Sequence, residues 1–212
     1  WDFNDGNNAS ISNANHIFTK PGTFQVNLFE GKNGRLVGTI PITVYADPVI
    51  TFTGTPISGC SPLQVVFTSS ITNDPAITIK DILWSFGDGN SSTLMNPNHT
   101  YTNSGKYNVS IRVNTSIAEC DKTFLVQEYI QVTGTKAAFT LSKSVGCEIP
   151  STILIANFTK DENGNTYLWD FGNGSTSTLF DPKMIVYNST GTYKITLKVI
   201  DNKGCESTIS QS

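Results

Sequence analysis

Short runs in which apolar and polar residues alternate recur along the whole chain, and segments rich in Thr, Ser, Asn and Gly separate them. In residues 107–113 every second side chain is apolar and those between are polar, and residues 193–199 repeat this pattern. A period of two is typical of a strand with one buried and one solvated face. No segment shows the 3.6-residue period of an amphipathic helix, so the pattern predicts an all-β chain.

A tryptophan motif occurs three times, at Trp84-Ser-Phe-Gly-Asp-Gly89, Trp169-Asp-Phe-Gly-Asn-Gly174 and, in looser form, Trp1-Asp-Phe-Asn-Asp-Gly6. The spacing of about 85 residues is too long for a solenoid repeat and suits whole domains in series. Within each copy the Trp and the Phe two residues later share one face of a strand, and the turn residues after them predict a hairpin. We therefore expect these side chains in the domain cores: Trp1, Phe3, Trp84, Phe86, Trp169 and Phe171.

The repeat continues beyond the tryptophan, through Asn96-Pro-Asn-His-Thr-Tyr101 and Gly105-Lys-Tyr-Asn-Val-Ser-Ile-Arg-Val113 in one copy and through Tyr187 and Gly191-Thr-Tyr-Lys-Ile-Thr-Leu-Lys-Val199 in another. These motifs resemble the polycystic kidney disease (PKD) domain, an immunoglobulin-like β-sandwich, over essentially the whole chain. Ser85 and Asn173 depart from the family's Trp-Asp-Phe-Gly-Asp-Gly hairpin. The resemblance implies tandem β-sandwiches and adds Tyr107 and Tyr193 to the structural core, at the position of a tyrosine corner.

The repeat also predicts domain boundaries. We expect residues 1–46 to be the C-terminal part of a truncated PKD-like domain, 47–134 a complete one, and 135–212 one that lacks the end of its last strand. Half a sandwich cannot bury its own apolar face, so residues 1–45 should fold only with missing upstream chain or another partner. The joints near residues 45–48 and 133–136 are short and lack Gly/Ser tracts, which predicts restricted bending and an elongated array.

The four cysteines keep the repeat register. Cys120 and Cys205 follow the tryptophan of their copy at the same distance, whereas Cys60 precedes the segment 61–67 and Cys147 the matching segment 150–158. We expect disulfides Cys60–Cys120 and Cys147–Cys205, each closing a loop of about 60 residues and stabilising by roughly 4 kcal/mol. Reduced, buried thiols are the alternative. Metal binding is disfavoured because no Cys-x-x-Cys or neighbouring His accompanies either pair.

Other polar and aromatic positions have structural explanations. His16 and His99 share a repeat position that the last copy fills with Ile185-Val186, which favours strand packing or hydrogen bonding over catalysis or metal binding. The turn residues Asp5, Asp88 and Asn173 suit turn geometry, and calcium there is the alternative. The tryptophans are interpreted as core and not as sugar-stacking platforms. We therefore expect no catalytic residues, cofactor or metal, and no enzyme activity in this chain.

The formal net charge is −3 and 15% of residues are charged, with no basic stripe, so no nucleic-acid partner is expected. No apolar run approaches the roughly 18 residues of a membrane span, so no direct membrane insertion is expected. Two disulfides imply an oxidising compartment, which favours an extracellular, cell-surface location.

The placement of the cysteines resembles PKD repeats in large surface adhesins of gliding bacteria, which implies export by type IX secretion. Our leading hypothesis is a set of non-catalytic spacer or presentation modules of a cell-surface adhesin or filament. Neighbouring PKD-like domains, and a surface polysaccharide or another cell-surface protein, are the expected partners. Accessory stalk domains of a secreted polysaccharide hydrolase or peptidase are the alternative. A eukaryotic receptor ectodomain is a third hypothesis, because Asn-x-Ser/Thr sequons such as Asn90 and Asn188 recur.

Overall fold

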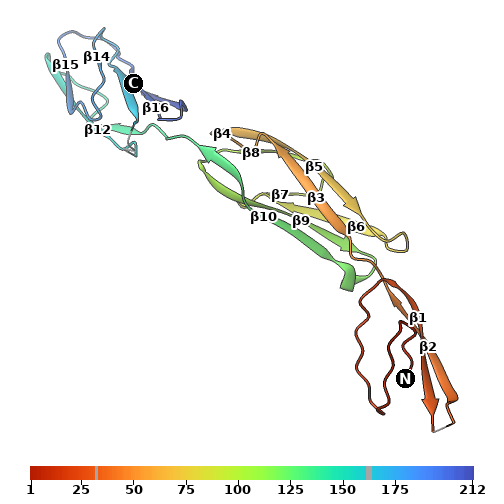
Figure 1. Cartoon of the computed structure of the whole chain (residues 1–212). Helices are drawn as coiled ribbons and strands as arrows, with labels where there is room; N and C mark the ends of the chain where they lie inside the picture. Colours follow the sequence, from red (N-terminus) through yellow and green to blue (C-terminus); the bar gives the residue numbers. More distant parts are fainter. Residues whose placement is uncertain (32, 161–163) are drawn as a thin grey trace. The chain divides into compact units, whose positions relative to one another are not determined.

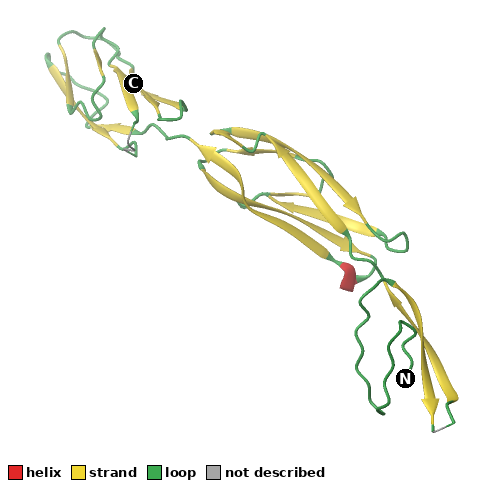
Figure 2. Cartoon of the chain, viewed as in Figure 1, coloured by secondary structure: helices red, strands yellow, loops and turns green. Residues whose placement is uncertain are grey.

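The computed structural model describes residues 1–31, 33–160 and 164–212 (Figure 1). Strands make up nearly all of its regular structure, with one short 3-10 helix, η1 (Ala118–Cys120), among the described residues (Figure 2). The prediction of an all-β chain is confirmed. The chain forms two compact units, the first from Trp1–Thr53, Phe67–Pro97 and Ser110–Val126, the second from Gly54–Val66, Asn98–Val109 and Gln127–Ser212.

The first 44 residues contribute one antiparallel pair, β1 (Gly22–Glu30) and β2 (Arg35–Val44), with a register shift between Leu28 and Phe29. Asp2 forms an isolated bridge to Asn27 of β1. A row of rings packs beside this pair: the Phe3 ring stacks on His16 at 4.0 Å, and the Phe18 ring stacks on Phe24 at 4.4 Å.

Two further sheets are formed by the middle of the chain. One is ordered β3-β5-β8 and the other β4-β10-β9-β6-β7. The strands are β3 (Val49–Thr55), β4 (Ser58–Cys60), β5 (Leu63–Thr72), β6 (Ile79–Ser85), β7 (Ser91–Ser92), β8 (Asn98–Tyr101), β9 (Gly105–Thr115) and β10 (Lys122–Thr133). All pairs whose register is known are antiparallel except β4–β10, which is parallel.

The last part of the chain forms sheets ordered β11-β12-β15 and β14-β13-β16-β17. Their strands are β11 (Phe139–Leu141), β12 (Ser151–Asn157), β13 (Thr166–Asp170), β14 (Thr176–Ser177), β15 (Met184–Tyr187), β16 (Ile195–Ile200) and β17 (Glu206–Gln211). The order β3-β5-β8 matches β11-β12-β15, and β10-β9-β6-β7 matches β17-β16-β13-β14, as the sequence repeat predicts. No counterpart of β4 is described in the last part of the chain.

Each pair of sheets encloses a tryptophan. Trp84 of β6 is fully buried, and its ring lies 5.1 Å from Phe52 of β3 and 5.3 Å from Phe67 of β5. Trp169 of β13 is likewise fully buried and lies 5.1 Å from Phe139 of β11. In both cases a ring from the opposite sheet covers the indole, which is the packing of a β-sandwich.

The hairpins after Trp84 and Trp169 depend on glycine. Gly172 has φ +73°, and a Cβ there would lie 2.8 Å from the carbonyl oxygen of Lys194. The first residue after the Trp-x-Phe strand therefore needs both a left-handed backbone and close approach to the neighbouring strand, which favours glycine.

The expected core residues are not all equally buried. Phe3, Phe86 and Phe171 are buried, whereas Tyr107 and Tyr193 are half-buried. The expectation for Trp1 is wrong: its side chain is half-buried and its Nε1 donates a hydrogen bond to the Ser12 carbonyl oxygen. The reason is that the only sheet described within residues 1–46 is the β1–β2 pair, so no second sheet covers the indole as one covers Trp84 and Trp169.

Candidate functional site

The most distinctive site in the chain is a disulfide between Cys60 and Cys205, with their Cα atoms 5.4 Å apart and a sequence separation of 145. Cys60 is the last residue of β4, and Cys205 directly precedes β17. Both lie in the second compact unit. The bond therefore joins the segment expected as the middle domain to the segment expected as the last one.

The peptide that connects these segments packs against the disulfide. Thr133, the last residue of β10, pairs in parallel with Cys60 and accepts a backbone hydrogen bond from Ser61 at 2.8 Å. Its Oγ1 lies 3.3 Å from Cys205 Sγ and donates to the Gly59 carbonyl oxygen at 3.3 Å. These contacts hold the connecting peptide against both cysteines.

Gly134 follows directly, with φ +126°, and a Cβ on it would lie 3.6 Å from the Cβ of Cys205. Three residues later, the Ala137 amide donates to Ser207 Oγ at 3.0 Å. The connection is thus fixed by a covalent bond, by a parallel strand pair and by hydrogen bonds on both sides.

The predicted pairing of Cys60 with Cys120 is wrong. Cys120 ends η1, two residues before β10 begins, while Cys60 pairs with Thr133 at the other end of that strand. β10 is 12 residues long. At about 3.3 Å per residue this places Cys120 roughly 40 Å from the Cys60 end of the strand, whereas a disulfide needs Cα atoms within about 7 Å.

The predicted pairing of Cys147 with Cys205 is also wrong, for a similar reason. Cys147 lines a cavity together with Tyr193 and Ile195, at the start of β16. Cys205 lies beyond the far end of β16, which is 6 residues long. About 20 Å of strand therefore separates the two positions.

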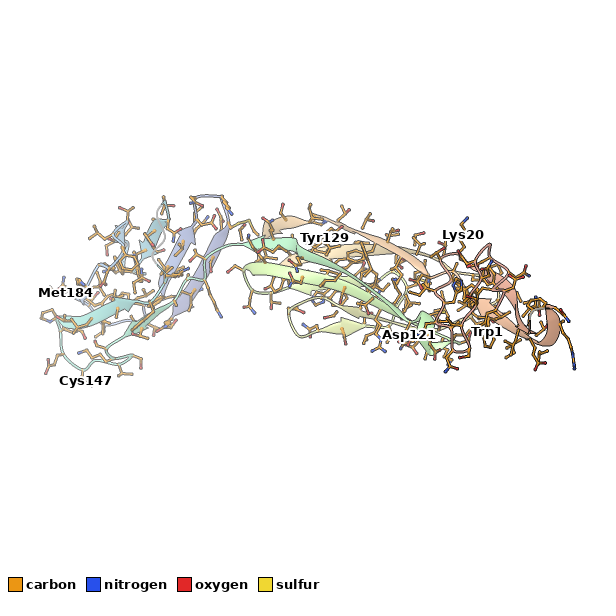
Figure 3. All side chains as sticks on the ribbon, turned by 60° about the horizontal axis from the view of Figure 1, so that its bottom comes forward. Trp1, Lys20, Asp121, Tyr129, Cys147 and Met184 are labelled. Atoms are coloured by element: carbon orange, nitrogen blue, oxygen red, sulfur yellow. A yellow bond between two sulfur atoms is a disulfide. The ribbon has the colours of Figure 1, made fainter. Side chains whose placement is uncertain are left out.

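Two cysteines are left as thiols, and their surroundings differ. Cys120 is buried, and this burial, followed by the nearby carboxylates of Asp47, Glu119, Asp121 and Asp74, raises the pKa of its thiol. Cys147 is exposed, in the loop before β12, and is labelled in Figure 3. Cys147 is thus the accessible thiol of the two.

The three hairpin tips use their polar side chains in the same way. Asp5 Oδ1 accepts the Asn7 amide, Asp88 Oδ1 accepts the Asn90 amide, and Asn173 Oδ1 accepts the Ser175 amide, each at 3.0 Å. These oxygens close the turn onto its own backbone. Within the described residues, no group of three or more His, Cys, Asp or Glu side chains is placed to hold a metal ion.

The two histidines contact aromatic rings. His16 lies between Phe3 and Phe18, with its Nε2 2.7 Å from Asp5 Oδ2. The His99 ring meets the Tyr101 ring edge-on at 4.6 Å. No helix in the described part of the chain is long and apolar enough to cross a membrane.

Comparison with known families gives two matches that together cover most of the chain. One family model described as "PKD domain" matches residues 1–34 and 45–127, and another with the same description matches residues 130–211. The second match ends after Cys205, and the boundary between the two lies within β10, just before the disulfide joint.

Individual relatives match single domains. The pre-pro-metalloprotease PrtV of Vibrio cholerae is 43% identical over 63 residues, which is 29% of this chain and 7% of that protein. Collagenase ColQ1 of Bacillus cereus is 54% identical over 50 residues, which is 23% of this chain and 5% of that protein. The chain thus spans less than a tenth of the length of these relatives.

Among solved structures, the crystal structure of the PKD1 domain from the Vibrio cholerae metalloprotease PrtV is 38% identical. The match covers 37% of this chain and 93% of that one, with a TM-score of 0.31.

Proposed function

Because the chain belongs to the PKD domain family, we propose that its tandem immunoglobulin-like domains are non-catalytic spacer modules of an extracellular protein, and that they transmit mechanical load along the polypeptide. The supporting observation is the Cys60–Cys205 disulfide. It crosses the connection between two successive family matches and is not confined to one of them.

The position of this bond determines which residues can be stretched. Tension applied at the two ends of the chain passes from Cys60 through the disulfide to Cys205. The residues between them form a closed loop that carries no tension while the bond is intact. A bond placed in this way limits extension under force, which a spacer module needs and a diffusible catalytic domain does not.

Single-molecule pulling on the 212-residue chain tests this function. With the disulfide intact, unfolding should release only the residues outside the loop. Reduction should add the separation of 145 residues, about 500 Å at up to 3.6 Å per residue. A Cys60→Ser, Cys205→Ser double variant should give the longer extension without reductant. Equal extension before and after reduction of the wild-type chain would contradict the proposal.

The leading context for such modules is a large cell-surface adhesin or filament, exported through type IX secretion and used in gliding motility. The supporting features are serial modules, cysteines in the same register in successive modules, and a joint reinforced by a disulfide. The disulfide also favours an oxidising, extracellular location. Other PKD domains of the same polypeptide and a surface polysaccharide or protein are the proposed partners.

A second context is an accessory stalk of a secreted peptidase or polysaccharide hydrolase. The similarity to a pre-pro-metalloprotease and to collagenases favours it. The two contexts differ in what the encoding gene places beside these modules. Many further modules would support the adhesin, and a catalytic domain beside two or three modules would support the stalk.

A further inference from the structure

The disulfide joins cysteines from two different positions of the repeat. Cys60 and Cys147 precede β5 and β12, the central strands of the three-stranded sheets of their modules, and are called the early cysteines. Cys120 and Cys205 precede the last strand, β10 and β17, and are called the late cysteines. The observed bond links the early cysteine of one module to the late cysteine of the next.

Cys60 ends β4 and Cys147 lies in the loop before β12, but the glycines before them are placed alike. A glycine precedes each of them, and a Cβ on Gly59 would lie 2.6 Å from Leu63 Cδ1, while one on Gly146 would lie 2.4 Å from Ser151 Oγ. Leu63 and Ser151 are themselves equivalent, because each begins its strand and pairs with the tyrosine that ends the neighbouring strand, Tyr101 or Tyr187. In both modules the glycine before the early cysteine therefore lies close to the first residue of the next strand.

The surroundings of the two early cysteines differ. Thr133, Gly134 and Cys205 lie against the segment that holds Cys60. At Cys147 a cavity of about 420 Å³ opens instead, lined by residues that include Cys147, Ser151, Tyr193 and Ser212. The Oγ of Ser151 is buried and has no hydrogen-bond partner among the described residues.

We propose that Cys147 is the acceptor of a second joint of the same kind, in which it bonds to the late cysteine of a further PKD module that follows in series. The cavity beside it receives the end of a last strand and the connecting peptide, as Thr133 and Gly134 are received beside Cys60. By the same rule Cys120, as a late cysteine, bonds to the early cysteine of a module that precedes its own. Each module is then cross-linked to the next, which extends the proposed load-transmitting function to longer arrays.

The bond forms by oxidation of two thiols, with a low-molecular-weight disulfide such as glutathione disulfide as oxidant. The Cys147 thiolate attacks glutathione disulfide, forms a mixed disulfide and releases one glutathione thiolate. The thiolate of the late cysteine of the next module then attacks Cys147 Sγ in this mixed disulfide and releases the second glutathione thiolate. Two protein thiols thus become one disulfide, and one glutathione disulfide becomes two thiols.

The test extends the chain after Ser212 with a second copy of residues 128–212, in which the copy of Cys147 is replaced by Ser. This extension supplies the second half of β10, a connecting peptide and a late cysteine. After folding in a glutathione redox buffer, non-reducing peptide mapping should find Cys60 linked to Cys205, and Cys147 linked to the Cys205 of the added copy. Cys120 should then be the one thiol that reacts after denaturation.

A Cys147→Ser variant of the extended chain is the matched control. It should keep the Cys60–Cys205 link, which shows that it has folded, and should yield two reactive thiols after denaturation. The proposal is overturned if the added late cysteine stays reduced, or pairs elsewhere, while Cys60–Cys205 forms. That result would leave the spacer function in place, because the pulling experiment measures only the Cys60–Cys205 loop.

Discussion

The carboxylate of Asp5 and the imidazole of His16 form a hydrogen bond across the first hairpin, with Oδ2 of Asp5 2.7 Å from Nε2 of His16. Both side chains are largely enclosed, with exposed fractions of 13% and 15%. Burial raises the pKa of the Asp5 carboxyl, but the hydrogen bond with His16, and those from Asn7, outweigh it and lower the pKa below its ordinary value. In the first copy of the repeat, the protonation of the turn residue Asp5 therefore depends on its hydrogen bond with His16.

This coupling predicts a pH dependence. Because the pKa of Asp5 is lower in the folded chain than in the unfolded one, its contribution to stability is present above the unfolded value of about 4. The contribution is lost as the pH falls through the folded value. A His16→Phe variant keeps a ring against Phe3 and removes the hydrogen bond, so the pKa of Asp5 should rise towards its ordinary value.

The measurement is a carbon-13 NMR titration of the Asp5 carboxyl in the wild type and in His16→Phe. Asp181 is the internal control, because a hydrogen bond from Lys183 lowers its pKa independently of His16. Unchanged titration of Asp5 in the variant would show that His16 does not set its pKa.

The two central tryptophans predict a difference in stability. Nε1 of Trp169 donates to the Leu179 carbonyl oxygen at 3.0 Å, whereas the buried Nε1 of Trp84 has no partner among the described residues. Both substitutions to Phe remove packing. Trp169→Phe also removes a hydrogen bond, so it should lower the free energy of unfolding by about 1 kcal/mol more than Trp84→Phe.

Urea denaturation of both variants, followed by far-ultraviolet circular dichroism, measures this difference. Because both indoles are fully buried, each variant serves as the packing control for the other. An equal loss in the two variants, or a larger loss for Trp84→Phe, would contradict the assigned role of the Trp169 hydrogen bond.

The strands and the central indoles could be predicted from the sequence because their signals are local. The alternation of Ile82 and Trp84 with Leu83 and Ser85 is reproduced in the burial of β6, and the glycine after the Trp-x-Phe motif has the left-handed backbone that such a turn needs. Neighbouring residues are enough to specify these features.

The disulfide could not be predicted in the same way, because its geometry depends on a non-local strand pair. The register of the cysteines suggested one bond within each module. The parallel pairing of β4 with the far end of β10 instead places Cys60 beside the next module. The dipeptide Gly-Cys occurs at residues 59–60, 146–147 and 204–205, so it does not distinguish an early cysteine from its late partner.

The two corner tyrosines donate to backbone a few residues upstream. Tyr107 Oη bonds to the Asn103 carbonyl oxygen at 2.7 Å, and Tyr193 Oη to that of Ser189 at 3.0 Å. Replacing either with Phe should cost about 1 kcal/mol of unfolding free energy, the usual net value of one hydrogen bond.

Tyr187→Phe is the comparison variant. In the unsubstituted chain, Oη of Tyr187 donates a hydrogen bond to the Phe171 carbonyl oxygen at 2.8 Å, and this hydrogen bond is buried. Loss of a buried partner costs about 1–3 kcal/mol, so this variant should be the least stable of the three. Thermal unfolding of the three variants would rule out this ranking if Tyr107→Phe or Tyr193→Phe proved the most destabilised.

The two free thiols should differ sharply in reactivity. Alkylation requires the thiolate, and burial together with neighbouring carboxylates raises the pKa of Cys120, so little thiolate forms there near neutral pH. Cys147 is exposed. Iodoacetamide should therefore label Cys147 in the native chain and Cys120 only after denaturation, as peptide mass spectrometry can measure. A Cys147→Ser variant should show almost no native labelling. Rapid native labelling of Cys120 would mean that η1 opens readily and that its thiol is not enclosed.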